Sequence, residues 1–152
     1  MTQDKHIHRQ NWSVVMINED QVEQLAIEWF EGLGYNYLNG YEISPESDNA
    51  LRDNYQDVLL ESRLKTSLIK LNSTLPITAI EEAIDILKKP QYSTLIQNNQ
   101  EFHKMLLGGI SVDIKKDDET IGEKVKLIDF HEKNNNDFLV VNQYTIKGIK
   151  GN

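Results

Sequence analysis

The stretch LLGGISVDI, residues 106–114, is where the hydrophobic pattern of the chain changes its period. The residues before it that lie on one face of a helix are Leu95, Asn99, Phe102 and Leu106. Gly108 and Gly109 are placed to end that helix. From Ile110 onward apolar and polar residues alternate, which is the pattern of a half-buried strand. The chain is therefore expected to combine helices with strands.

A second helical pattern occupies residues 19–33. It follows Asn18, a good N-cap residue, and ends before Gly34, which is suited to a helix C-terminus. Its apolar stripe, which is expected to face the core, consists of Val22, Leu25, Ala26, Trp29, Phe30 and Leu33. The spacing predicts one amphipathic helix over this segment.

A helical block is predicted over residues 57–107. Leucines recur with the helical period until Pro76 interrupts them, and Thr78 followed by Glu81 then has the spacing of a capping box. Residues 39–56, between the first helix and this block, are polar and rich in turn-forming residues. A long connection is predicted there.

The last third of the chain is predicted to form strands. Residues 110–115 and 124–128 are separated by a polar turn, so they are expected to pair as a hairpin. Residues 138–141 form a continuous apolar run, which is typical of a strand buried on both faces. Tyr144 and Ile146 are expected to extend that strand.

These patterns together predict a mixed α/β (α+β) fold with about four helices and a small, incomplete sheet of about four strands. Residues 1–17 form a polar lead-in, and residues 18–152 form one unit. In that unit the strands fall within residues 110–147, apart from a strand that starts near Tyr35.

Composition limits the classes of function. The chain has 152 residues, of which 39% are hydrophobic, so it is one globular domain or a piece of a larger protein. The net charge of −8 is unlike that of a freestanding nucleic-acid binder, which is usually basic. Cysteine is absent, which excludes disulfides and thiolate chemistry. No apolar run could span a bilayer, and residues 1–12 lack the apolar segment of a signal peptide, so a soluble cytoplasmic protein without membrane contact is expected.

Three polar patterns have both a chemical and a plainer interpretation. Asp113 and Lys115 share one face of a strand, as a metal-binding carboxylate and its lysine do in many nucleases, but alternation on a solvated hairpin is the simpler explanation. His6 and His8 could chelate a metal, although a solvated tail is the simpler interpretation. His103, beside an apolar stripe, is more simply a packing or hydrogen-bonding residue than a catalyst.

Several blocks of the chain, in order, resemble one family. They are EDQVEQLA at 19–26, LGY at 33–35, YQDVLL at 55–60, LNSTLP at 71–76, STLIQNN at 93–99, LIDF at 127–130 and NDFLVVNQYT at 136–145. Over residues 18–147 the chain is similar to the beginning of the restriction (R, motor–nuclease) subunit of type I restriction–modification enzymes.

The resemblance implies a Mg²⁺-dependent nuclease domain of the PD-(D/E)xK type, followed by an ATP-driven motor that this chain does not contain. Such a subunit joins modification and specificity subunits and cleaves foreign DNA in host defence. In the family, the catalytic Asp and the Glu-x-Lys motif follow the segment that Asn142, Gln143 and Tyr144 resemble. This chain has no Pro-Asp pair. It is therefore expected to be an N-terminal portion of that domain and catalytically incomplete alone.

The resemblance also singles out three residues of this chain. Glu23 lies at the margin of the first apolar stripe, where periodicity alone makes it an ordinary flanking glutamate. The family comparison makes it an ancillary catalytic residue and Mg²⁺ ligand. Asn142 and Gln143 would then lie near the metal site and contact DNA or orient water. The alternative is that they satisfy hydrogen bonds at a strand edge.

Two expectations about partners follow. The strand at residues 137–147 is expected to have an unpaired edge, through which the isolated chain would self-associate. The alternative function is a non-catalytic assembly or regulatory module that docks on the modification and specificity subunits.

Overall fold

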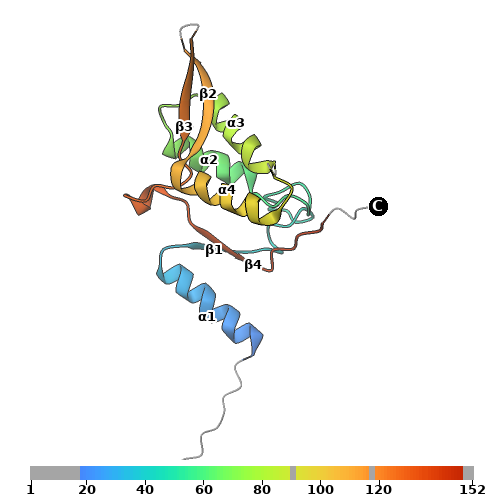
Figure 1. Cartoon of the computed structure of the whole chain (residues 1–152). Helices are drawn as coiled ribbons and strands as arrows, with labels where there is room; N and C mark the ends of the chain where they lie inside the picture. Colours follow the sequence, from blue (N-terminus) through green and yellow to red (C-terminus); the bar gives the residue numbers. More distant parts are fainter. Residues whose placement is uncertain (1–17, 90–91, 117–118, 149–152) are drawn as a thin grey trace, which may run out of the picture.

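A computed structural model describes residues 18–89, 92–116 and 119–148 of the chain (Figure 1). The elements are α1 (Glu19–Gly32), β1 (Asn36–Asn39), α2 (Glu61–Leu71), α3 (Ile77–Lys88), α4 (Leu95–Gly108), β2 (Ile110–Lys116), β3 (Glu119–Val125), the short 3-10 helix η1 (Lys133–Asn135) and β4 (Leu139–Asn142). The mixed α/β class is confirmed. The predicted lead-in 1–17, with His6 and His8, lies outside the described residues.

The hydrophobic core lies where α2 and α3 pack against the β2–β3 hairpin. Its largest fully buried side chains are Leu68, Ile80, Ile84 and Val125. Ile110 and Val112 are buried, while Ser111 between them and Asp113 after them are exposed, so the alternation in the sequence is confirmed. The apolar faces predicted by the helical and the strand periods therefore pack together in this core.

Asn72 joins two parts of this core through its buried side chain. Its Nδ2 donates to the carbonyl oxygens of Leu68 and Lys126, at 2.9 and 3.0 Å. Its Oδ1 accepts from the Lys126 backbone N–H at 2.8 Å. The C-terminus of α2 is thereby fixed to the chain that leaves β3, because buried backbone groups need such partners.

A second, separate sheet consists of β1 and β4, which pair in parallel. Asn36 is paired with Leu139 and Asn39 with Asn142, so two segments about one hundred residues apart end at the same edge. Helix α1 lies on this pair, away from the main core (Figure 1). Tyr35 stacks on Phe138 and meets the edge of Phe30, which joins the helix end to both strands.

The predicted single sheet is wrong, because the strands form two sheets of two strands each. The second hairpin strand begins at Glu119 and ends at Val125, earlier than the predicted 124–128, because register with β2 pairs Ile110 with Val125. The run at 138–141 is only half-buried, since a two-stranded sheet cannot cover it on both sides.

Two other local predictions are also wrong. Strand β4 ends at Asn142, so Tyr144 and Ile146 do not extend it; the backbone there bonds instead to the loop at residues 52–58. Thr78 is not a helix cap, because α3 begins at Ile77 behind Pro76 and has no side-chain cap.

The helix predicted at 19–33 is confirmed by α1, including its N-cap, but its apolar stripe does not face the core. The Asn18 side chain accepts from the Gln21 N–H, and the Gln21 side chain in turn accepts from the Asn18 N–H. The exposed stripe consists of Val22, Leu25, Trp29 and Leu33, and Trp29 is 81% exposed. Ile27 is the one buried side chain of α1. Because the sheet beneath α1 is only two strands wide, it covers the side of the helix that carries Glu23 and Ile27. The apolar stripe is left exposed to solvent.

Candidate functional site at the ends of the parallel strands

The ends of β1 and β4 touch through their backbones. Gly40 follows β1, and its N–H donates to the carbonyl oxygen of Asn142 at 2.9 Å. A Cβ at Gly40 would lie 2.5 Å from the carbonyl oxygen of Gln143 and 2.6 Å from that of Asn142. Only glycine leaves room for this approach. The contact fixes where the side chains that follow the strands are placed.

Gln143 turns the chain at the end of β4. Its φ of 51° places a non-glycine residue in the left-handed region. Its Nε2 donates to Glu23 Oε1 at 3.1 Å, and its Oε1 accepts from the Tyr41 hydroxyl at 3.5 Å. Two residues predicted for one site, 120 positions apart, thus lie in contact.

Asn142 occupies the last position of β4, one residue before Gln143. Its Oδ1 accepts a hydrogen bond of 2.9 Å from the hydroxyl of Tyr37, which lies on β1. Tyr37, Gly40 and Tyr41 were not predicted as site residues. The Asn39–Gly40 pair indicated a turn, but a parallel pairing that brings these tyrosines to Asn142 and Gln143 leaves no local signal in the sequence.

The donor types of the cluster suit a hard divalent cation. Mg²⁺ prefers carboxylate, amide and water oxygens, and protein sites usually supply one or two carboxylates. Glu23, which is half-exposed, provides one carboxylate. Asn142 and Gln143 carry amide oxygens, which here accept from the hydroxyls of Tyr37 and Tyr41. In the described part of the chain, no three acidic or histidine side chains converge as a metal site would require. The residues therefore fit Mg²⁺ in kind, but further ligands would have to come from elsewhere.

The other sequence candidates lie apart from this cluster. Asp113 and Lys115 are exposed on β2, where Asp113 faces Gly122 across the hairpin, which fits the solvated-strand interpretation. His103 is exposed on α4, so its predicted packing role is wrong.

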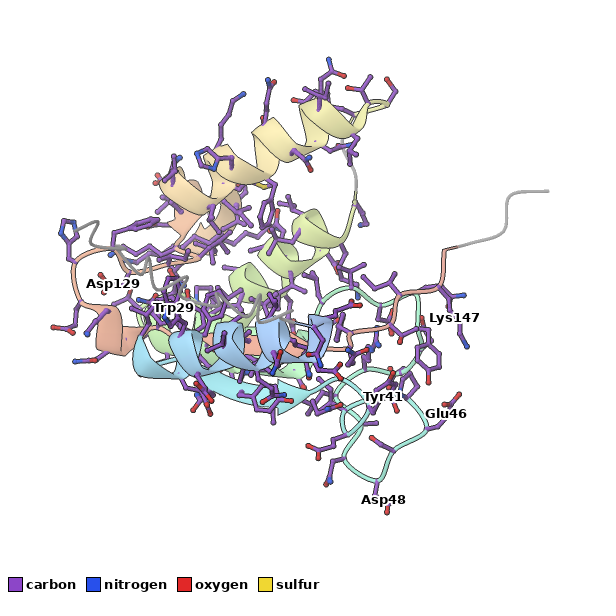
Figure 2. All side chains as sticks on the ribbon, turned by 90° about the horizontal axis from the view of Figure 1, so that it is seen from below. Trp29, Tyr41, Glu46, Asp48, Asp129 and Lys147 are labelled. Carbon is purple, nitrogen blue, oxygen red and sulfur yellow. The ribbon has the colours of Figure 1, made fainter. Side chains whose placement is uncertain are left out.

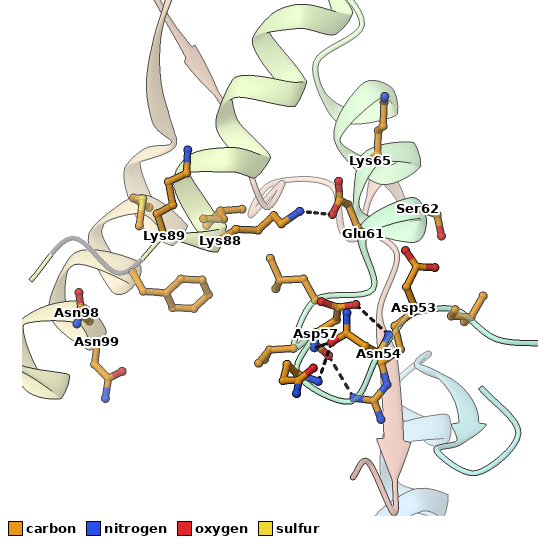
Figure 3. Close-up of a pocket in the computed structure, with 18 of the residues that line it drawn as sticks. Asp53, Asn54, Asp57, Glu61, Ser62, Lys65, Lys88, Lys89, Asn98 and Asn99 are labelled. Carbon is orange, nitrogen blue, oxygen red and sulfur yellow. Dashed lines mark hydrogen bonds and ion pairs between the residues drawn. The ribbon is translucent and has the colours of Figure 1, made fainter. Parts of the chain in front are cut away.

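A groove of about 1070 Å³ lies between α4 and the loop that leads into α2 (Figure 3). On the wall of this groove, Lys88 Nζ forms an ion pair with Glu61 Oε2 at 2.6 Å. This bond raises the pKa of Lys88 above its ordinary value. Asp57, Asn99 and Phe102 also line the groove, so its surface mixes both charges with apolar side chains.

Asp129 lies in a loop at the opposite end of the molecule from Tyr41 and Lys147 (Figure 2). Hydrogen bonds from the Asn135 side-chain amide and from the backbone N–H groups of Glu132 and His131 lower the pKa of Asp129 to about 2. These donors belong to its own loop, so the carboxylate is committed to holding the turn before η1.

The structure is a mixed α/β domain whose polar cluster follows the carboxyl ends of two parallel strands, where α/β proteins commonly place their functional residues. The family model of the type I restriction enzyme R protein N terminus matches residues 16–152, and the chain belongs to this family.

Two curated relatives agree with the family. The chain is 32% identical over 136 residues to the type I restriction enzyme HindI endonuclease subunit of Haemophilus influenzae. It is 31% identical over 135 residues to the putative type I restriction enzyme MjaIXP endonuclease subunit of Methanocaldococcus jannaschii. The matches cover 90% and 86% of this chain but only 13% and 12% of the relatives. No solved structure matches the chain significantly.

No helix in the described ranges is long and apolar enough to cross a membrane.

Proposed function

We propose that this chain forms the N-terminal part of the nuclease domain of a type I restriction R subunit, which cleaves foreign DNA in the cytoplasm together with modification and specificity subunits. The observation that carries the proposal is the contact between Glu23 on α1 and Gln143 after β4. Family membership and the printed names of the two relatives support it.

Glu23 is proposed as an ancillary ligand of a Mg²⁺ site of the PD-(D/E)xK type. Bound Mg²⁺ would stabilise charge on the phosphate and lower the pKa of attacking water. The amide of Gln143 orients the Glu23 carboxylate, and Tyr41 in turn orients Gln143. Asn142 and Gln143 are proposed to contact the DNA backbone or to orient water. The principal Asp and Glu-x-Lys, and the ATP-driven motor, are proposed to lie in other parts of the subunit.

Replacing Glu23 with glutamine is expected to reduce DNA cleavage by the full-length subunit about 10- to 100-fold, because supporting groups of a metal site carry effects of this size. The measurement is Mg²⁺- and ATP-dependent cleavage by the subunit assembled with its modification and specificity subunits. Glu28→Gln, an equal change at an exposed position of α1, serves as the matched control. Equal rates for Glu23→Gln and the parent would remove Glu23 from the site.

A second candidate function is docking without catalysis, favoured by the exposed stripe of α1. Four large apolar side chains on one helix face are more than scattered surface residues, and such patches mark interaction sites. Under this alternative, the modification and specificity subunits bind to the exposed stripe of α1.

The isolated chain is also proposed to self-associate through the free edge of β4 and the α1 stripe, since each strand of a two-stranded sheet has one unpaired edge. Sedimentation is expected to show dimers or larger species for the 152-residue chain. The Trp29→Glu substitution is expected to shift the association equilibrium toward monomer. A monomeric parent chain contradicts self-association. Capture of the modification and specificity subunits by that monomer, lost in Trp29→Glu, would favour the docking function instead.

A further inference from the structure

The chain that leaves β4 is held to the loop at residues 52–58 by a set of bonds outside the hydrophobic core. The hydroxyl of Tyr144 donates to the carbonyl oxygens of Val58 and Asp57, at 3.2 and 3.4 Å. The Lys147 N–H donates to the carbonyl oxygen of Tyr55 at 2.9 Å. None of these residues belongs to the core cluster of α2, α3 and the hairpin.

Arg52 is the centre of this attachment. Only 6% of the residue is exposed, although it carries a charge. Its Nη2 donates to the carbonyl oxygen of Thr145 at 2.7 Å, and its Nη1 donates to that of Asp57 at 3.2 Å. The guanidinium carbon lies 3.9 Å from the centre of the Tyr144 ring.

The burial of Arg52 needs an explanation, because burying a charge is costly unless it is paired. In the described ranges no carboxylate forms an ion pair with Arg52, and its buried Nε has no hydrogen-bond partner. The charge of Arg52 is compensated by two carbonyl oxygens and by the rings of Tyr144 and Tyr55. A lysine could reproduce only part of this, since the flat guanidinium both stacks and donates in two directions.

The attachment begins one residue after Gln143. Left-handed backbone at a non-glycine residue persists only where the surroundings hold it. Gly40 and Asn142 hold Gln143 from one side, and the Arg52 stack on Tyr144 holds it from the other. The direction of the Gln143 side chain toward Glu23 therefore depends on both contacts.

We propose that Arg52 is a positioning residue for the candidate site: by clamping Tyr144 and Thr145 it keeps Gln143 turned toward Glu23 and sets the path of the chain beyond β4. This inference rests on the proposed nuclease function. Arg52 does not itself touch DNA or metal in this role.

The test uses the full-length subunit with Arg52→Met, Arg52→Lys and Tyr144→Phe. In metal-free buffer, hydrogen exchange of peptides covering residues 139–148 is expected to speed up in Arg52→Met, while peptides from α2 and α3 stay protected. Cleavage is expected to fall about tenfold or more, because small displacements of positioned groups have effects of this size. The Mg²⁺ concentration for half-maximal cleavage is expected to rise. Arg52→Lys is expected to recover part of the rate.

Tyr144→Phe keeps the ring beneath the guanidinium and removes only the hydroxyl bonds, so it is expected to lose less than Arg52→Met. Lys104→Met, which removes a positive charge from an exposed position on α4, is the control.

An unchanged Mg²⁺ requirement and unchanged exchange in Arg52→Met would overturn the inference. If Arg52→Met fails to fold, an exchange rate and Mg²⁺ requirement in Arg52→Lys equal to those of the parent would overturn it. If Glu23→Gln also leaves cleavage unchanged, the proposed function of the site fails as well; an effect of Glu23→Gln alone confines the failure to Arg52.

Discussion

Replacing Leu68 with alanine is expected to lower the free energy of unfolding of the chain by about 3–4 kcal/mol, in the range measured for fully buried leucines. Leu68 has no exposed surface and belongs to the core cluster with Ile80, Ile84 and Val125. Helices α2 and α3 meet there, so the smaller side chain leaves a cavity, and α2 cannot shift into it without straining the Asn72 bonds to Lys126. Urea unfolding followed by circular dichroism measures the change.

The neighbouring residue supplies the matched control. Ile69 lies on the same helix but is 39% exposed, so Ile69→Ala is expected to cost about 1 kcal/mol or less, since little apolar area leaves water there. Equal losses for the two variants would mean that α2 does not present Leu68 to the core. The ratio of the two effects therefore tests the packing, independently of any function.

The main core could be predicted from the sequence because its signals are local. The change of period at residues 106–114 correctly separates α4 from β2, and the alternation through Ile110 and Val112 correctly gives the buried face of the hairpin. Short-range spacing decides which side of a helix or strand is apolar. The elements built on such spacing were therefore found, with errors mainly at their ends.

The second sheet could not be predicted, because pairing between distant segments has no periodic signal. Nothing near Asn36 indicates that its partner strand begins at Leu139. The stripe of α1 was correctly identified as apolar, yet the width of the sheet beneath, not the helix, decides that Trp29 is exposed. The spacing of apolar residues predicts which face of a helix is apolar, but it does not predict which other element packs on that face.

The candidate site was predicted only in part, for a related reason. Glu23 and Gln143 were singled out through the family resemblance, and the structure places them in contact. Arg52 gave no signal, because a single arginine in a polar loop is ordinarily a solvated residue. Its burial depends on Tyr144, whose position in turn depends on the end of β4.

Replacing Gly40 with alanine is expected to open the β1–β4 pair. The added Cβ would lie 2.5 Å from the carbonyl oxygen of Gln143, and the obstacle is backbone, which cannot turn aside as a side chain can. Overpacking of this kind costs about 1–3 kcal/mol or more. The strain falls on a pair of four-residue strands that lies outside the main core, so we expect local opening and not global unfolding.

Hydrogen exchange of the 152-residue chain distinguishes these outcomes. In Gly40→Ala, the amides of Asn36 and Gly40, which bond to Phe138 and Asn142, are expected to lose protection while the α2 amides keep theirs. Gly32→Ala is the matched control: it adds the same methyl group at the end of α1, where nothing lies within 4 Å, and is expected to stabilise the helix by about 0.5–1 kcal/mol. Unchanged protection of Asn36 and Gly40 in Gly40→Ala would mean that the strand ends do not meet as closely as described. Since Gln143 reaches Glu23 only from that meeting point, loss of protection in Gly40→Ala should be accompanied by loss of the DNA cleavage that we propose for the full-length subunit.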